Sequence, residues 1–399
     1  MSMKAIVNGR LVLPGEVLEN RALLYDGKIL GIVAPGEIPA EAERLDAQGR
    51  MVLPGLMDLH IHGYQGEDAS DGSFEGLKVM AQGVAKNGVT AFLPTTMTVS
   101  YDELRRAFAQ IRRAMAESRK DDWMGAAIVG ANAEGPFINA AKKGAQAEEH
   151  VRPGDAAFLK EYADVIRLFT IAPEVDGNMD CIREMAKQPG VRISMGHTAA
   201  TYDQAKAAID AGVRHVTHLF NAQTGLHQRD PGVVGAALTD GRVTCELIAD
   251  TFHVHRALFE LVAKMKGENL ALITDCLRAT GLEDGTYTLG GQEFTLQGIQ
   301  CHLKDGTIAG SVLKLNHAIK NMLDNTDLTI PEAVKMASLT PARCIGLDGC
   351  KGSIEVGKDA DLVLCRGNVM DVESEIQCVL IEGCAVPGLP LCPRGGEKN

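Results

Sequence analysis

The sequence lacks the features that mark secreted and membrane proteins. Its opening residues lack the basic stretch followed by ~7 to 15 apolar residues that marks a secretory signal. No later segment approaches the ~20 apolar residues that a membrane helix needs. None of the ten cysteines precedes Cys181, and no CxxC pair occurs, which is a poor framework for disulfides or a zinc-thiolate site. We therefore expect a cytoplasmic protein with reduced thiols and no membrane partner.

Positive charge is also scarce. The 40 Lys and Arg against 52 Asp and Glu give a formal net charge of -12, which argues against a surface built to bind nucleic acid or an anionic membrane. An anionic ligand would need a local basic pocket. With 399 residues and 45% hydrophobic content, the chain can bury a large core, such as a catalytic barrel with a small second domain.

Both ends of the chain predict short β-strands. Residues 5–14, 22–35 and 44–55 are apolar runs broken by turn signals, with Asn8-Gly9 and Asp26-Gly27 at hairpin positions. Residues 353–383 have the same character. Neither piece alone can bury much surface, so we predict that residues 1–53 and 347–399 form one small β-sandwich domain.

Residues 54–346 predict a metal-dependent catalytic (β/α)8 TIM-like barrel, and the fold class is α/β. Apolar runs alternate with helix-like stretches such as 74–88, 101–118 and 201–212, at spacings near ~30 residues. After the last strand we expect an inserted hairpin or two and then a helix from about 313 to 323. The eight predicted strands are 51–63, 89–97, 126–136, 168–174, 192–197, 215–221, 244–253 and 270–276.

Polar residues stand where these predicted strands end, although a buried barrel strand should be almost entirely apolar. In a (β/α) barrel the carboxyl ends of all strands face one opening, where active sites of this fold lie. We therefore expect these side chains to converge. They are His60, His62, Glu134, His197, His218, His253 and Asp275.

Imidazoles and a carboxylate at these positions favour a metal site. His60 and His62 lie two apart on a strand and point to the same side, although an exposed strand can carry such a pair by chance. His197 and His218, each taken singly, are more often hydrogen-bonded core histidines. Glu134 would suffer a large desolvation cost without a cation. Together they suit zinc or iron with an open position for water.

Two residues near these strand ends, Asp275 and Arg229, have two interpretations each. Asp275 could cap a helix, but beside a metal site one carboxylate can take a proton from water and return it to a leaving nitrogen. Arg229, in the loop after the sixth strand, is either an ordinary surface arginine or a phosphate-binding group. Cys276 is interpreted as a packing residue.

Several motifs together resemble the N-acetylglucosamine-6-phosphate deacetylase family of the amidohydrolase superfamily. The similarity spans nearly the whole chain, and the ordered combination is specific although no single motif is. It implies hydrolysis of N-acetyl-D-glucosamine 6-phosphate to D-glucosamine 6-phosphate and acetate, in amino-sugar catabolism and recycling, by a homodimer or a homotetramer. The motifs include DLHIHG at 58–63, NAEGPFINAAKKGAQ at 132–146, SMGHTAATYDQA at 194–205, THLFNA at 217–222 and ITDCLRATGLEDGTYTLGG at 273–291.

The resemblance also implies roles for individual residues. Glu134, His197 and His218 match the principal metal ligands of the family, and Asp275 matches its general base and acid. Asn221 and Ala222 match substrate contacts. Arg229 and His253 match groups that hold the sugar phosphate, partly across a dimer interface.

Two positions depart from some members of the family. Some members lack the histidine pair of the first strand and use one metal ion, whereas this chain keeps His60 and His62. One or two ions are therefore possible, and we expect two. Gln146 stands where some members carry a histidine, so the sugar-hydroxyl contact at that position is in question.

Other functions remain open from the sequence. The same chemistry could act on N-acetylgalactosamine 6-phosphate. A cyclic-amide hydrolase or deaminase is disfavoured because NAEGPF lacks a lysine and because Arg229 and His253 suit a phosphate. A catalytically inactive barrel that serves as a binding protein should have lost some ligands, and here none is missing.

Overall fold

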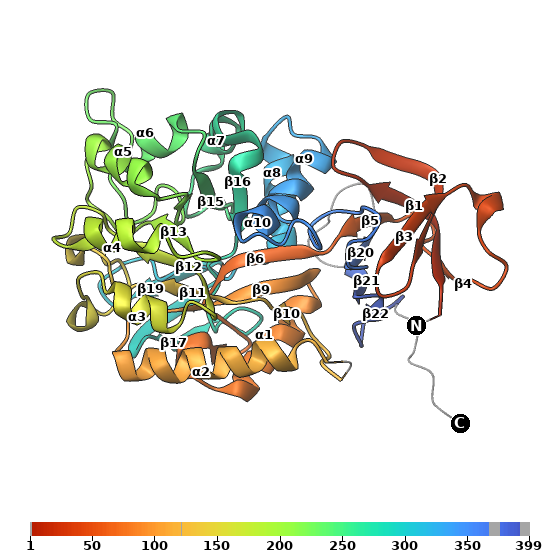
Figure 1. Ribbon diagram of the computed structural model, residues 1–399, viewed down its shortest axis with the longest axis horizontal. Helices are drawn as coiled ribbons and strands as arrows, with labels where there is room; N and C mark the ends of the chain where they lie inside the picture. The colour runs from red at the N-terminus through yellow and green to blue at the C-terminus, as the bar shows by residue number, and fades with distance from the viewer. Residues whose placement is uncertain (1, 121, 367–375, 392–399) are drawn as a thin grey trace.

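The computed structural model describes residues 2–120, 122–366 and 376–391. Figure 1 shows a barrel with its surrounding helices and, beside it, a smaller β domain in which strands from both ends of the chain lie together. The predicted fold class is confirmed. Parts of the predicted C-terminal segment 347–399, namely 367–375 and 392–399, lie outside the described residues, and the boundaries at 53/54 and 346/347 remain predictions.

The β domain is one curved sheet of eight strands. Apolar side chains of its N-terminal strands, such as Leu23 and Ile29, share one buried cluster with Leu362 and Leu380 from its C-terminal strands. The halves of the sheet therefore face each other across a common core, as in a sandwich. Its strands are β1 (Lys4–Val12), β2 (Val17–Tyr25), β3 (Ile29–Val33), β4 (Glu43–Asp46), β5 (Met51–Pro54), β20 (Leu362–Cys365), β21 (Ile376–Ile381) and β22 (Cys384–Ala385).

Two strand predictions near the N-terminus were only partly right. Asp26-Gly27 joins β2 to β3 as a hairpin, but Asn8-Gly9 lies inside β1, where Asn8 has a φ of 55° and the register with β2 shifts. This shift is a bulge, which uses the same residue types as a turn. The predicted strand 51–63 is divided at Gly55, so that β5 pairs with β20 and β6 (Leu56–Ile61) enters the barrel.

The barrel sheet is parallel, and it closes between its first and last strands. Asp275 N donates to His60 O over 2.8 Å, and His62 N donates to Cys276 O over 3.0 Å. The closing contacts therefore lie at the carboxyl ends, where the polar residues gather. After β6 the strands are β9 (Val89–Thr96), β10 (Ala127–Ile128), β11 (Ala131–Glu134), β12 (Ile166–Ile171), β13 (Arg192–Met195), β14 (His215–Val216), β15 (Thr244–Ile248) and β16 (Leu270–Ile273).

Helices surround the barrel, and the predicted helices near 74–88, 101–118, 201–212 and 313–323 are all present. In α2, Ser100 and Glu103 form a capping box, and Leu104, Phe108 and Ile111 are buried at helical spacing. The helices are α1 (Phe74–Ala85), α2 (Tyr101–Glu117), α3 (Ala156–Glu161), α4 (Asn178–Met185), α5 (Tyr202–Ala211), α6 (Gly232–Thr239), α7 (Phe259–Lys266), α8 (Leu315–Asn325), α9 (Ile330–Met336) and α10 (Leu339–Cys344).

The inserted hairpins that follow the last barrel strand form a separate sheet of three strands, β17 (Gly285–Leu289), β18 (Gln292–Gln297) and β19 (Gln300–Leu303). A short hairpin, β7 (Gly63–Tyr64) and β8 (Glu67–Asp68), follows β6. Among residues 2–120, 122–366 and 376–391, no helix is both long and apolar enough to cross a membrane. Every cysteine in those ranges has a free thiol.

A buried lysine, Lys351, pairs with carboxylates that precede β20 in the β domain. Lys351 Nζ lies 2.8 Å from Asp359 Oδ2 and 2.8 Å from Asp361 Oδ2, and Asp361 also accepts a hydrogen bond from the Glu382 backbone amide. All three side chains are at most 9% exposed. If the lysine were removed, bulk water could not solvate either carboxylate in its place.

Lys351→Ala should therefore destabilise the protein by about 3–5 kcal/mol, because it leaves a buried carboxylate without its cation. Urea denaturation measures the change. Lys160→Ala is the control, because the ion pair of Lys160 with Glu184 is solvent-exposed and should be worth less than about 1 kcal/mol. Equal losses of unfolding free energy in the two variants would contradict a stabilising role of the buried Lys351 ion pairs.

Candidate metal centre

Five side chains from four strands converge at the carboxyl end of the barrel. Glu134 is the last residue of β11, and His60 and His62 stand at the end of β6. His197 and His218 each follow their strand by two residues. All five are at most 5% exposed. They form two groups that could hold a metal ion, His60–His62–Glu134 and Glu134–His197–His218.

Glu134 belongs to both groups. Its Oε1 lies 3.1 Å from His197 Nε2 and 2.7 Å from His218 Nε2. Its Oε2 lies 3.2 Å from His62 Nε2, and Oε1 lies 3.4 Å from His60 Nε2. Within each histidine pair the two Nε2 atoms are 3.3 Å and 3.1 Å apart. One carboxylate therefore stands between two pairs of imidazoles.

The separations and the second ring nitrogens fit a metal centre. Ligand atoms about 2.0–2.1 Å from a tetrahedral ion stand about 3.3 Å apart, close to the observed spacings. Histidines that bind metals through Nε2 usually donate Nδ1–H to an oxygen. His60 Nδ1 faces Glu246 Oε2 at 3.0 Å, His62 Nδ1 faces Thr95 O at 3.1 Å, and His197 Nδ1 faces Lys142 O at 2.8 Å. His218 Nδ1 has no partner among the described residues.

Asp275 lies beside the first histidine pair. Its Oδ1 is 3.2 Å from His62 Nε2 and 3.5 Å from His60 Nε2. Burial raises the pKa of Asp275, but the hydrogen bond from His62 and the charge of His60 outweigh burial and hold the pKa below its usual value. Asp275 is therefore an ionised carboxylate that can accept a proton.

Several residues at this end of the barrel have a left-handed backbone, which non-glycine residues rarely adopt and which clusters at functional sites. The φ angles are 46° at His197, 27° at His218, 51° at Ala222 and 50° at Asp275. These residues lie beyond the strands, which explains why β13, β14 and β16 end before the predicted segments 192–197, 215–221 and 270–276 do. The chain leaves the strand conformation where the functional side chains begin.

A cavity of about 360 Å³ lies over the centre, within the size range of small-molecule sites. Its wall includes His62, Glu134, His197, His218 and Asp275, together with the predicted substrate residues Asn221, Ala222 and His253. Lys142 adds a cation, and Leu289 and Ile308 from the inserted sheet region close one side.

Two further residues predicted to bind the phosphate differ in position. The His253 side chain is 4% exposed, and its Nδ1 lies 2.6 Å from Asp250 Oδ2. Burial lowers the pKa of His253, but the hydrogen bond with Asp250 outweighs burial and raises it. Arg229 is exposed and is not among the residues that line the cavity of this chain. A single chain therefore brings His253, but not Arg229, to the cavity.

Sequence reasoning missed two contacts inside the centre. Gln146, considered only as a sugar contact, donates from Nε2 to Glu134 Oε2 over 2.6 Å, and its Oε1 accepts from the Thr98 amide over 2.6 Å. Glu246 stands in the middle of β15, so the pattern of polar residues at strand ends does not include it. Its signal was a charged residue inside the otherwise apolar run TCELI, at 244–248.

Two buried residues beside the centre, Cys276 and His215, have different roles. Cys276 is buried, its thiol donates to Gly63 O over 3.3 Å, and burial raises its pKa to about 12, as expected for a packing residue. His215 is the first residue of β14, and its Nε2 lies 2.9 Å from Glu246 Oε1, within the network behind His60.

Comparison with known proteins gives consistent relatives. Residues 51–386 match the amidohydrolase family. An N-acetylglucosamine-6-phosphate deacetylase of Bacillus subtilis is 38% identical over 386 residues, covering 92% of this chain and 96% of the relative. An N-acetylgalactosamine-6-phosphate deacetylase of Escherichia coli O157:H7 is 38% identical over 358 residues, covering 88% of this chain and 92% of the relative.

Solved structures agree with these relatives. The crystal structure of N-acetylglucosamine-6-phosphate deacetylase from Pasteurella multocida has a TM-score of 0.89 at 30% identity, covering 96% of this chain and 98% of the other. An alanine variant of the Mycobacterium smegmatis enzyme, solved in complex with N-acetyl-D-glucosamine 6-phosphate, has a TM-score of 0.86 at 29% identity, covering 97% and 100%.

Binding of zinc to this centre should release protons and should weaken as pH falls. Burial lowers the pKa of His62, but hydrogen bonds with Asp275 and Glu134 outweigh burial and raise it to about 9. The pKa of His197 is also raised, through Glu134. An ion must displace these protons. Displacement of the His62 proton should lower the apparent affinity about tenfold per pH unit below about 9, and displacement of the His197 proton should add to this effect below its own raised pKa.

Titration calorimetry with zinc, in buffers of different ionisation enthalpy, counts the released protons. His62→Gln should release fewer protons than the wild type. His302→Gln is the control, because His302 is a partly exposed residue of β19 outside the centre. An affinity that stays constant between about pH 6 and 9 would contradict the prediction.

Proposed function

The chain belongs to the amidohydrolase family, and on that premise we propose that it hydrolyses the acetamide of N-acetyl-D-glucosamine 6-phosphate to acetate and D-glucosamine 6-phosphate. The observation that carries this proposal is Asp275 Oδ1 at 3.2 Å from His62 Nε2, beside the two groups that share Glu134, on the wall of one cavity. The relatives of similar length named for this reaction support the same substrate class.

The proposed cofactor is zinc or iron, with two ions in each subunit. One would be held by Glu134, His197 and His218 and the other by His60, His62 and Glu134, because each group supplies ligand atoms with suitable spacings. A divalent ion in this centre would polarise the acetyl carbonyl and make water a stronger nucleophile.

Asp275 would then transfer the proton from water to the leaving amine. Asp275 would take one proton from the attacking water as the new carbon–oxygen bond forms. It would deliver that proton to the sugar nitrogen as the carbon–nitrogen bond breaks, so that the amine leaves neutral. Gln146 would hold Glu134 Oε2 rather than a sugar hydroxyl, since its side-chain NH₂ group and its side-chain oxygen already have protein partners.

The proposed phosphate site combines two subunits. His253 would contact the phosphate from within the cavity, with its imidazole oriented by Asp250. Arg229 would reach the cavity of a second subunit, because it is exposed and absent from the wall of its own cavity. Asn221 and Ala222 would contact the sugar. A homodimer, or a homotetramer built from such dimers, in the cytoplasm is therefore proposed, with a role in amino-sugar catabolism and recycling.

N-Acetylgalactosamine 6-phosphate is the second candidate substrate, because the E. coli relative with that name has the same 38% identity as the B. subtilis relative. The two sugars differ at one hydroxyl, and kcat/KM values measured side by side would rank them. A catalytically inactive binding protein is disfavoured, since all five proposed metal ligands and Asp275 are present.

Asp275→Asn should keep its metal and lose about 10²- to 10⁴-fold in kcat, because the amide cannot take a proton from water. Acetate release and metal content are measured together. Cys276→Ser is the control: it changes the neighbouring buried residue, and its hydroxyl can still donate to Gly63 O. Full turnover by a metal-loaded Asp275→Asn protein would refute the role of Asp275.

Arg229→Ala should raise KM for N-acetylglucosamine 6-phosphate far more than for N-acetylglucosamine, because the guanidinium would contact only the phosphate. Steady-state kinetics on both sugars measure the difference. Arg183→Ala, at an exposed arginine of α4, should change neither value. Equal effects of Arg229→Ala on the two sugars would rule out phosphate binding.

A further inference from the structure

We propose that Glu246 is a positioning residue that fixes the metal-binding face of His60 and so controls occupancy of the His60–His62–Glu134 position. The proposal deepens the proposed function, because it assumes that this group holds an ion. It does not depend on which sugar is the substrate. Glu246 is fully buried in β15, which is separated from β6 by the single strand β16, and Glu246 is not among the residues that line the cavity.

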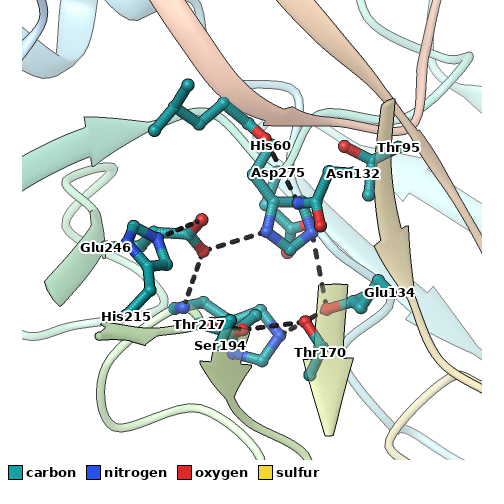
Figure 2. A network of polar contacts seen from close by, with 12 residues as sticks. His60, Thr95, Asn132, Glu134, Thr170, Ser194, His215, Thr217, Glu246 and Asp275 are labelled. Atoms are coloured by element: carbon teal, nitrogen blue, oxygen red, sulfur yellow. Dashed lines mark hydrogen bonds and ion pairs between the residues drawn. The ribbon is translucent and has the colours of Figure 1, made fainter. Parts of the chain in front are cut away.

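Three N–H groups point at the Glu246 carboxylate. Oε2 lies 3.0 Å from His60 Nδ1 and 3.0 Å from the backbone nitrogen of His218. Oε1 lies 2.9 Å from His215 Nε2. Figure 2 shows the carboxylate between the His60 and His215 rings, with Glu134 on the far side of His60.

This arrangement decides which nitrogen of His60 carries the hydrogen. An ionised carboxylate only accepts hydrogen bonds, so His60 must present Nδ1–H to Glu246. The lone pair of Nε2 then points toward Glu134 Oε1, His62 Nε2 and Asp275 Oδ1, at 3.4, 3.3 and 3.5 Å. In the opposite tautomer, the unprotonated Nδ1 of His60 would face Glu246 Oε2, so that two acceptors would meet. The hydrogen on Nε2 would then point to the place proposed for the ion.

Glu246 also contacts the second ligand group. The amide that it accepts from belongs to His218, whose backbone has the unfavourable φ of 27°. The same oxygen therefore holds the ring of one proposed ligand and the backbone of another. Because His218 and His60 belong to different groups, Glu246 links the two positions from behind, as Glu134 links them from the front.

The hydrogen-bond donors around Glu246 match a carboxylate, and a glutamine could replace it only if a neighbouring group changes. With three donors around it and no acceptor, this site is satisfied only by a side chain with two acceptor oxygens. A glutamine could accept from His60 and His218, but its NH₂ group would face His215 Nε2. His215 could adapt by exchanging hydrogens with Cys344, whose Sγ lies 3.1 Å from His215 Nδ1. Glu246→Gln can therefore keep the fold while removing the negative charge behind His60.

The decisive experiment compares zinc binding by the wild type, Glu246→Gln and Glu246→Asp. Zinc is titrated into metal-free protein against a competing chelator, and bound ions are counted by native mass spectrometry. Partners of metal-ligating histidines typically contribute about 10- to 100-fold in affinity. We expect Glu246→Gln to bind the weaker of two zinc ions about 10- to 100-fold less tightly and to retain the other. Glu246→Asp keeps the charge but withdraws the oxygens from His60. Its affinity for the weaker zinc ion should therefore lie between those of the wild type and Glu246→Gln.

Nitrogen NMR of the imidazoles supplies a readout that general destabilisation would not change. In zinc-loaded wild type, His60 should show Nδ1 bearing the hydrogen, and Glu246→Gln should weaken or lose that preference. Asp58→Asn is the matched control. Asp58 is buried on β6, the strand of His60. It accepts from Thr274 Oγ1 and from the backbone amides of His60 and Thr274 but contacts no imidazole, so zinc affinity and the His60 tautomer should be unchanged.

Each outcome decides the proposal. Unchanged affinity for both ions in Glu246→Gln, loss of the same affinity in Asp58→Asn, or a wild type that binds a single ion would overturn it. If Glu246→Gln does not fold, Glu246→Asp decides by the same criteria. Failure of the proposed function is distinguishable, because a wild type that binds two zinc ions but releases no acetate from the sugar phosphate would refute deacetylation and leave the role of Glu246 standing.

Discussion

The centre depends on one buried carboxylate, Glu134, that is shared by four imidazoles. A carboxylate with 2% exposure is strongly destabilised unless cations surround it. Burial raises the pKa of Glu134, but the charges of His60 and His197 and the hydrogen bonds from His197 and His218 outweigh burial and hold the pKa well below its usual range. Without metal, the imidazoles must carry protons to balance this charge. A divalent ion held by these residues would replace those protons, so the same electrostatic requirement would apply with and without the ion.

The barrel supplies this geometry through its closure. The segment that follows the last strand, β16, forms backbone hydrogen bonds with His60 and His62 at the end of the first strand, β6. Asp275 lies in that segment, and its amide makes one of these bonds. The proposed proton carrier and the first histidine pair are therefore fixed by the same few peptide groups. Behind them, Thr95, Lys142 and Glu246 accept from the second ring nitrogens. Rings held at one nitrogen can present only the other to an ion.

The substrate side is less complete within one chain. The cavity has imidazoles, Lys142 and apolar walls from the inserted sheet region, but Arg229 lies outside it. A protein with net charge -12 must attract a sugar phosphate through local cations rather than through its overall field. A second subunit that contributes Arg229 would add such a cation, so the proposed dimer would complete the phosphate site.

The sequence by itself determined the fold class and the candidate ligands. The alternation of apolar runs and amphipathic stretches predicted the barrel, and polar residues at strand ends predicted convergence, because parallel strands share one open face. Only the tertiary structure decided which atoms meet. Sequence spacing could not indicate that Gln146 would bind Glu134, that Glu246 would lie behind His60, or that Arg229 would miss its own cavity. These contacts join β15 to β6 and a loop to β11, and their geometry depends on how the strands are offset when the barrel closes, which local sequence does not encode.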